Sequence, residues 1–147
     1  MHAPSASTTR LHIGSDADLA WVRHEVRQAA AGLGFSLVQQ TKLVTAASEL
    51  ARNTLVHGGG GHVEMTHLDD GVRGGLRLAF TDEGPGIPDL ELAMTDGYTS
   101  GGGLGLGLSG AKRLVHEFTL DSRPGQGTTV TVTDWATALP SARTGGS

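Results

Sequence analysis

Residues 99–110 (TSGGGLGLGLSG) have the composition of a loop that binds an anion. Glycines cost backbone entropy to order and add no side chain to a core, so a folded domain uses such a run where a ligand approaches the backbone. The run leads into residues 111–118, which have a helical pattern. A helix start presents free N–H groups and the positive end of the helix dipole, and both attract phosphate. The alternating Leu104, Leu106 and Leu108 argue against a solvated linker.

Two familiar nucleotide motifs do not explain this loop. Residues 105–110 match the dinucleotide pattern G-x-G-x-x-G, but no apolar strand leads into them and too little chain follows for a βαβ unit. Lys112 does not belong to a P-loop, because the G-x-x-x-x-G-K-[ST] spacing is absent. The loop therefore needs partner residues from elsewhere in the chain.

Candidate partners lie on a predicted helix and after a predicted strand. Glu49 and Asn53 are four residues apart, so their side chains point the same way on a helix. Asp82 follows a strand and precedes Gly84 and Gly86, where a carboxylate could accept a hydrogen bond from a ligand amine while the glycines let the ligand lie close. Taken singly, each pattern also fits a solvated helix face or a capped turn.

The composition predicts one cytoplasmic domain. A chain of 147 residues can bury a core, and the low aromatic content of 4% indicates that Leu, Val and Ala build it. The net charge of −4 argues against a nucleic-acid partner, which usually requires a basic face. The absence of cysteine excludes disulfides and thiolate metal sites, and no apolar run resembles a membrane span or a signal peptide.

Periodicity and turn residues predict three main helices, at 16–33, 36–57 and 108–117, and five strands, at 8–13, 62–68, 75–81, 117–122 and 128–133. Ser15 or Asp16 is expected to cap the first helix, and Ser36 and Gln39 to form a capping box on the second. A short helix is expected at 89–94, a mobile cover at 95–100 and flexible tails at 1–7 and 136–147. Histidines spaced five apart lack zinc-ligand spacing and are interpreted as surface residues: His57, His62 and His67.

Four motifs, each common by itself, are specific because they occur together and in this order. They are E-x-x-x-N (Glu49, Asn53), D-x-G-x-G (Asp82, Gly84, Gly86), G-x-G-x-G (Gly103, Gly105, Gly107) and G-T (Gly127, Thr128). Together they resemble the GHKL superfamily of ATP-binding domains, which includes gyrase B subunits, Hsp90 chaperones, sensor histidine kinases and MutL proteins. The resemblance covers residues 8–135 as a single domain. It implies an α/β two-layer sandwich, the Bergerat fold, with helices on one face of a mixed, mainly antiparallel sheet.

The amino-acid sequence within the motifs is similar to that of the anti-sigma regulatory serine/threonine kinases, in particular the RsbT-type switch kinases of bacterial stress signalling. Residues 48–53 (SELARN), 82–89 (DEGPGIPD) and 105–114 (GLGLSGAKRL) carry this similarity. One departure is His116, at a position where the family pattern has an acid before Glu117. It lies outside the ATP motifs, so it bears on partner contacts rather than on chemistry.

The resemblance implies a role for each matched residue. Glu49 would be the general base, Asn53 would ligate Mg²⁺, and Asp82 would accept the adenine amino group. Gly86 would pass under the base and Thr128 would support its pocket. The implied nucleotide contacts are Asn53, Asp82, Gly84, Gly86, Ile87, Thr99, Ser100, Gly102, Gly103, Leu104, Gly105, Leu106, Gly107 and Thr128. Phosphoryl transfer needs positioning, charge neutralisation and a base, and this set supplies all three.

The function implied by the resemblance is that of a serine/threonine protein kinase, which uses ATP and Mg²⁺ to phosphorylate a STAS-domain antagonist protein. The alternative is a binding module that sequesters a sigma factor, with ATP tuning its affinity. A sigma factor or a downstream phosphatase is a further candidate partner, whereas no nucleic acid or membrane is expected. The sequence leaves open whether the chain forms a homodimer and what Arg52 does.

Overall fold

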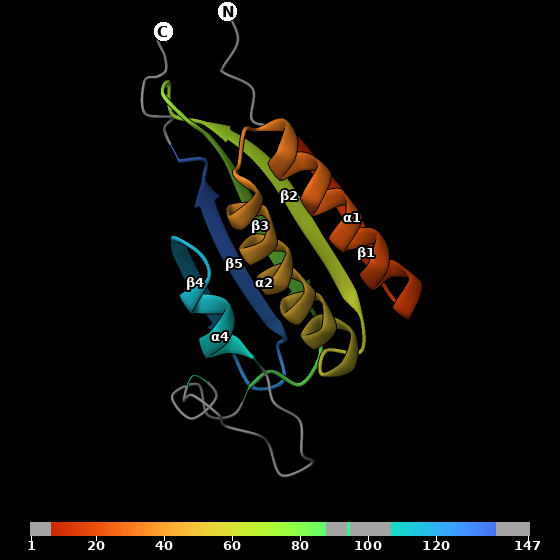
Figure 1. Cartoon of the computed structure of the whole chain (residues 1–147). Coiled ribbons are helices and arrows are strands. Elements are labelled where there is room, and N and C mark those ends of the chain that lie inside the picture. Colours follow the sequence, from red (N-terminus) through yellow and green to blue (C-terminus); the bar gives the residue numbers. More distant parts are fainter. Residues whose placement is uncertain (1–6, 88–93, 95–106, 138–147) are drawn as a thin grey trace, which may run out of the picture.

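The computed structural model describes residues 7–87, 94 and 107–137 (Figure 1). The helices are α1 (Asp16–Gly32), α2 (Leu37–Val56) and α4 (Leu108–Arg113). The strands are β1 (Thr8–Ile13), β2 (Gly61–Asp69), β3 (Gly74–Asp82), β4 (Glu117–Ser122) and β5 (Thr128–Trp135). No helix in these ranges is long and apolar enough to cross a membrane.

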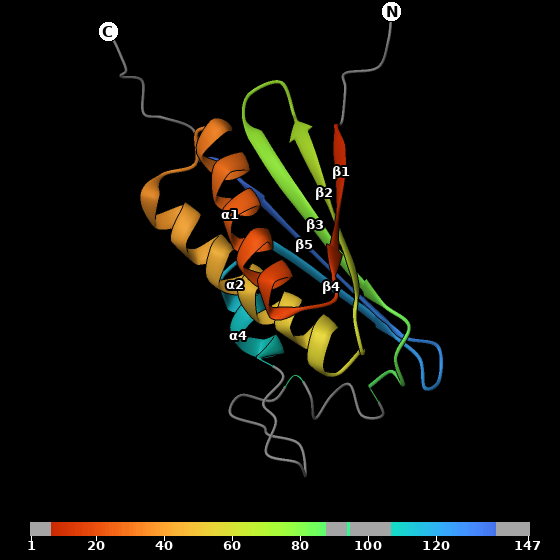
Figure 2. The ribbon, with the colours of Figure 1, turned by 90° about the vertical axis from the view of Figure 1, so that its right-hand side faces the viewer.

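The strands form one five-stranded sheet in the order β1-β2-β3-β5-β4, and every pairing among the described residues is antiparallel. The helices lie together on one face of this sheet, as the side view shows (Figure 2). The predicted two-layer α/β sandwich, with helices on one face of a mainly antiparallel sheet, is therefore confirmed. The opposite face carries no helix of the described residues.

The two long helices begin as their capping residues predict. The Ser15 side chain accepts a hydrogen bond from the Asp18 N–H at the start of α1. Ser36 and Gln39 form the predicted capping box on α2, in which the Ser36 hydroxyl accepts the Gln39 N–H and the Gln39 side chain accepts the Ser36 N–H. Gly34, with a φ of 87°, follows α1 and turns the chain towards α2.

The core lies between the sheet and one face of each long helix. Alternation along the strands directs apolar residues to this core: Val63, Met65, Leu76, Leu78, Phe80, Val130 and Val132. The buried face of α2 consists of Leu43, Ala46, Ala47, Leu50, Ala51 and Thr54. Thr54 belongs to this face because its hydroxyl donates to the Leu50 carbonyl at 3.0 Å. Val44 and Leu55 of α2 are only partly buried.

The last predicted helix is too long by four residues. Helix α4 ends at Arg113 and β4 begins at Glu117. Between them, the His116 N–H donates to the Asp134 carboxylate at 2.9 Å instead of to a helical carbonyl, which fixes the chain outside the helix. The predicted short helix at 89–94 and cover at 95–100 lie outside the described residues, apart from Met94.

Candidate functional site

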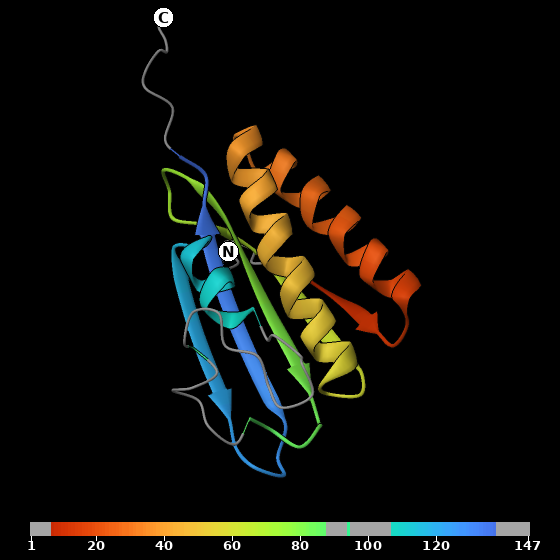
Figure 3. The ribbon, with the colours of Figure 1, turned by 60° about the horizontal axis from the view of Figure 1, so that its bottom comes forward.

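The ends of several elements meet at one end of the molecule (Figure 3). The C-terminal end of α2, the start of α4, the end of β3 and the start of β5 gather there. Glu49 and Asn53 lie on α2 close to this end, and both side chains are half-buried on the same side of the helix. Arg52, next to them, is exposed.

Gly107 brings the start of α4 against Glu49. It is the N-cap of α4, with a left-handed φ of 65° that favours glycine. A Cβ placed on Gly107 would lie 2.6 Å from the Glu49 Oε1 atom, closer than real Cβ contacts allow. The last glycine of the G-x-G-x-G motif and the carboxylate of the E-x-x-x-N motif therefore share one site.

Asp82 is held at the end of β3, directly opposite Thr128 in the sheet register. Its Oδ1 accepts the Gly84 N–H at 2.9 Å, and the Thr128 N–H also donates to the carboxylate. Burial raises the pKa of Asp82 above its usual value, and these hydrogen bonds and the nearby His57 reduce the rise. The carboxylate is thus fixed by the backbone while part of it stays open to a ligand.

The glycine run 58–61 contributes more to this site than the sequence indicated. In the sequence this run only follows the helix predicted at 36–57. A Cβ on Gly58 would overlap the Asp82 carboxyl group, and a Cβ on Gly84 would lie 2.7 Å from the Gly58 Cα. His57, which precedes the run, has its pKa lowered by burial and partly restored by the Asp82 charge. A run of four glycines, longer than a helix end requires, was the signal for this close packing.

Ser122 joins the two turns that flank Asp82, a role that sequence reasoning missed. Its hydroxyl accepts the Ile87 N–H at 2.8 Å and lies 2.7 Å from the Thr128 hydroxyl. Gly86, with a φ of 80°, packs against the Arg123 carbonyl, where no Cβ would fit. The two predicted contacts Ile87 and Thr128 are thereby tied to each other through one serine.

A cavity of about 540 Å³ opens beside Asp82. Its lining combines the glycine run with polar residues of β1, β2 and β3 and the residue that follows β3: Arg10, His12, His62, Thr81, Asp82 and Glu83. Glu49 and Asn53 do not line it, so it lies on the β1 side of Asp82 rather than between Asp82 and α2. Within the described residues, no group of three His, Cys, Asp or Glu side chains could hold a metal ion.

Two clusters of predicted site residues emerge at this end of the molecule. One is Glu49, Asn53 and Gly107, and the other is Asp82, Gly84, Gly86, Ile87 and Thr128. The remaining predicted contacts lie outside the described residues: Thr99, Ser100, Gly102, Gly103, Leu104, Gly105 and Leu106. The described part offers a carboxylate one helical turn from an amide side chain, a helix start, and the half-buried Asp82 among closely packed glycine turns. This set fits a nucleotide with its phosphates near α4 and an amine at Asp82.

Residues 38–135 match the family model described as "Histidine kinase-, DNA gyrase B-, and HSP90-like ATPase". The serine/threonine-protein kinase RsbT of Bacillus subtilis is 41% identical over 85% of this chain and 94% of its own length. An anti-sigma F factor of Bacillus licheniformis is 31% identical over 78% of this chain and 82% of its own.

A solved structure gives the same fold. The RsbU and RsbW domains of Rv1364c from Mycobacterium tuberculosis superpose with a TM-score of 0.59 and 22% identity. The match covers 90% of this chain and 33% of the solved one. At this identity the likeness shows the fold alone.

Proposed function

The chain belongs to the histidine kinase-, DNA gyrase B- and HSP90-like ATPase family, and we propose that it is a serine/threonine protein kinase of the switch type. It transfers the γ-phosphoryl group of ATP to a serine or threonine of a STAS-domain antagonist protein. The contact between Gly107 and Glu49 carries this proposal, because it places a carboxylate beside the helix start that ends the glycine motif. The kinase relative, similar over nearly its whole length, supports a protein as acceptor.

Each described residue has a defined task in this reaction. Glu49 accepts the proton of the attacking hydroxyl, and α4 faces the phosphates with its N-terminal end. Asp82 accepts a hydrogen bond from the adenine amino group, and the Ser122–Thr128 pair keeps the turn beneath the base in place. Mg²⁺ prefers few protein oxygens together with phosphates and waters, so Asn53 would hold it and the ion would neutralise phosphate charge.

A second candidate function is sequestration of a sigma factor with ATP as modulator. The similarity to an anti-sigma F factor favours it. Both functions use the same nucleotide site, so only turnover separates them. A kinase passes phosphate to a protein, whereas a sequestering module binds its partner without transfer.

Labelled phosphate distinguishes the two functions. The purified chain is incubated with γ-³²P-ATP, Mg²⁺ and a lysate of its own cells, with Glu49→Gln in a parallel reaction. We expect acid-stable phosphoserine or phosphothreonine on one small protein, absent with the variant, and mass spectrometry should find a STAS domain in it. Label on a protein without that domain would contradict the substrate class. Free phosphate alone would indicate an ATPase, and ATP binding without turnover would favour sequestration.

Replacing Gly107 with alanine should slow phosphate transfer at least tenfold. The left-handed φ of 65° costs a residue with a Cβ about 1–2 kcal/mol, and that Cβ would displace the Glu49 carboxylate. The melting temperature should fall by only a few degrees. Initial rates of transfer and thermal unfolding measure the two effects.

Gly110→Ala is the matched control for this variant. Gly110 lies in the same short helix, and a Cβ there meets nothing within 4 Å. Alanine at this position should leave transfer unchanged and stabilise the helix by about 0.5–1 kcal/mol. Equal rates for the two variants would show that the contact between Gly107 and Glu49 has no role in transfer.

A further inference from the structure

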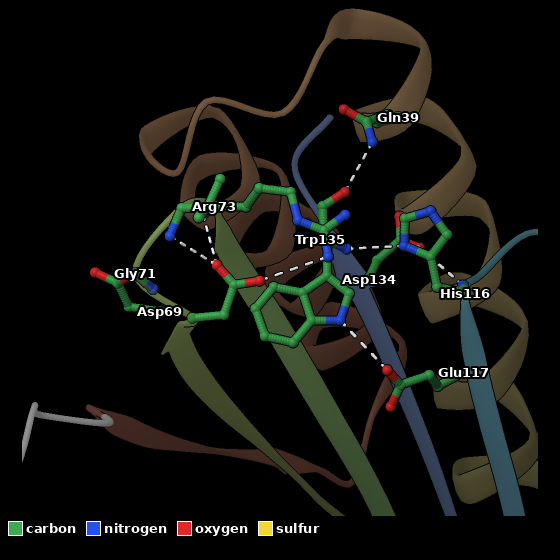
Figure 4. Close-up of polar contacts among 10 residues, drawn as sticks. Gln39, Asp69, Gly71, Arg73, His116, Glu117, Asp134 and Trp135 are labelled. Carbon is green, nitrogen blue, oxygen red and sulfur yellow. Dashed lines mark hydrogen bonds and ion pairs between the residues drawn. The ribbon is translucent and has the colours of Figure 1, made fainter. Parts of the chain in front are cut away.

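A second polar cluster lies at the other end of the molecule, where β4 begins and β5 ends beside the start of α2 (Figure 4). The Asp134 side chain is buried, with 4% of the residue exposed, whereas half of the His116 side chain is exposed. Asp134 Oδ1 accepts the His116 backbone N–H at 2.9 Å and lies 3.0 Å from His116 Nδ1.

Two groups compete for the same ring nitrogen of His116. The Trp135 backbone N–H donates to Nδ1 at 3.0 Å, and the Asp134 carboxyl group lies equally close to it. A ring nitrogen carries either a lone pair or a proton. With a lone pair, Nδ1 accepts the Trp135 N–H but opposes the lone pairs of the carboxylate. With a proton, it donates to Asp134 and can no longer accept from Trp135.

Both contacts coexist only if Asp134 carries the proton. Burial raises the pKa of Asp134, and the His116 N–H, the His116 ring and the charge of Lys42 on α2 reduce the rise. The half-exposed His116 ring can be solvated as a cation. Between about pH 5 and 8, histidine is the side chain that ordinarily changes charge.

Two further charged groups contact the Trp135 side chain, and one of them, Arg73, also pairs with Asp70. Glu117 of β4 accepts the Trp135 indole N–H at 3.3 Å. The Arg73 guanidinium of the β2–β3 hairpin lies 5.3 Å from the centre of the Trp135 ring. These contacts involve only the tryptophan side chain. The Trp135 backbone N–H donates instead to His116.

We propose that His116 is a proton-operated latch on the end of β5. The neutral ring accepts the Trp135 N–H and fixes the strand end. One proton from solvent, added at Nδ1, redirects the ring to Asp134 and releases the Trp135 N–H.

The latch connects to the helix that carries Glu49. Gln39 donates from its side chain to the Trp135 carbonyl at 2.9 Å and accepts the Thr137 N–H at 3.3 Å. The same side chain closes the capping box at the start of α2. Release of Trp135 therefore loosens the strand end that is tied to the α2 cap, far from the nucleotide end of the molecule.

Amide exchange and ring ¹⁵N shifts of the full chain test the latch between pH 7.5 and 5.5. After correction for intrinsic exchange, the protection of the Trp135 amide should fall about fivefold on acidification, the worth of one hydrogen bond. The His116 Nδ1 signal should gain its proton over the same range. The Val132 amide in the middle of β5 should not change.

Two variants separate the contribution of His116 from that of Asp134. In His116→Asn the replacement has no titrating ring, so the pH dependence at Trp135 should disappear. In Asp134→Asn the ring loses its anionic partner, so Trp135 should stay protected to lower pH. The proposal is overturned if Trp135 protection is independent of pH, if His116→Asn retains the dependence, or if Nδ1 stays unprotonated while the carboxyl group titrates.

Discussion

Glu49→Gln is expected to bind ATP with unchanged affinity and to transfer phosphate about 10²–10⁴ times more slowly. Glutamine keeps the shape of glutamate and so still fills the space beside Gly107. It cannot take the proton of an attacking hydroxyl, because an amide is not a base at neutral pH. The loss therefore falls on the transfer step and not on nucleotide binding, since Glu49 is not itself among the proposed nucleotide contacts.

Single-turnover transfer and calorimetric titration with ATP check this expectation. Glu64→Gln is the control, because Glu64 lies on β2 and forms only an exposed ion pair with Arg10 at 3.1 Å. Such a pair contributes little to stability. Transfer by Glu49→Gln at the rate of the parent would exclude Glu49 as the base and leave positioning alone to explain catalysis.

Local signals predicted the fold well because they act within a few residues. The capping box at Ser36 and Gln39 has the contacts that the spacing indicates. Strand alternation places the buried apolar residues on the helix side, so a shift of one residue would expose the whole set. For the same reason, β1 and β4 begin and end at the predicted residues.

The contacts that assemble the site could not be predicted in this way. Glu49 and Gly107 are far apart in the sequence, and only the docking of α4 on α2 brings them together. Ser122 appears as the last residue of an ordinary strand until the sheet register sets its hydroxyl beside Thr128. Motif spacing therefore identified residue types, whereas tertiary packing decided their neighbours.

The contacts of His116 could not be predicted from the sequence either, although the sequence singled this residue out. The sequence identified it as a departure from the family pattern and associated it with partner contacts. Its position next to Asp134 follows from the pairing of β4 with β5, which also ends α4 earlier than helical periodicity predicts. A residue that ends a helix by bonding to a distant strand leaves no signal in the local sequence.

Asp82→Asn is expected to lower the affinity for ATP by about 10–100-fold. A hydrogen bond to a charged group is worth about 1.5–3 kcal/mol, and each 1.4 kcal/mol corresponds to a factor of ten. The asparagine oxygen can still accept the Gly84 N–H, so the turn should keep its shape. Asp121→Asn, an exposed change on β4, is the matched control and should bind ATP normally.

The stability of Asp82→Asn separates a binding role from a structural one. Burial raises the pKa of Asp82, so the folded state binds a proton more tightly than the unfolded state. The corresponding stabilisation is present at low pH and is lost as pH rises through the raised pKa. At neutral pH the ionised carboxylate therefore opposes folding, and asparagine should leave the free energy of unfolding unchanged or higher.

For the parent, ATP affinity should fall on acidification at a pH above the usual aspartate range, and this dependence should vanish in the variant. Normal ATP binding by Asp82→Asn would refute the assignment of the adenine amino group to this residue.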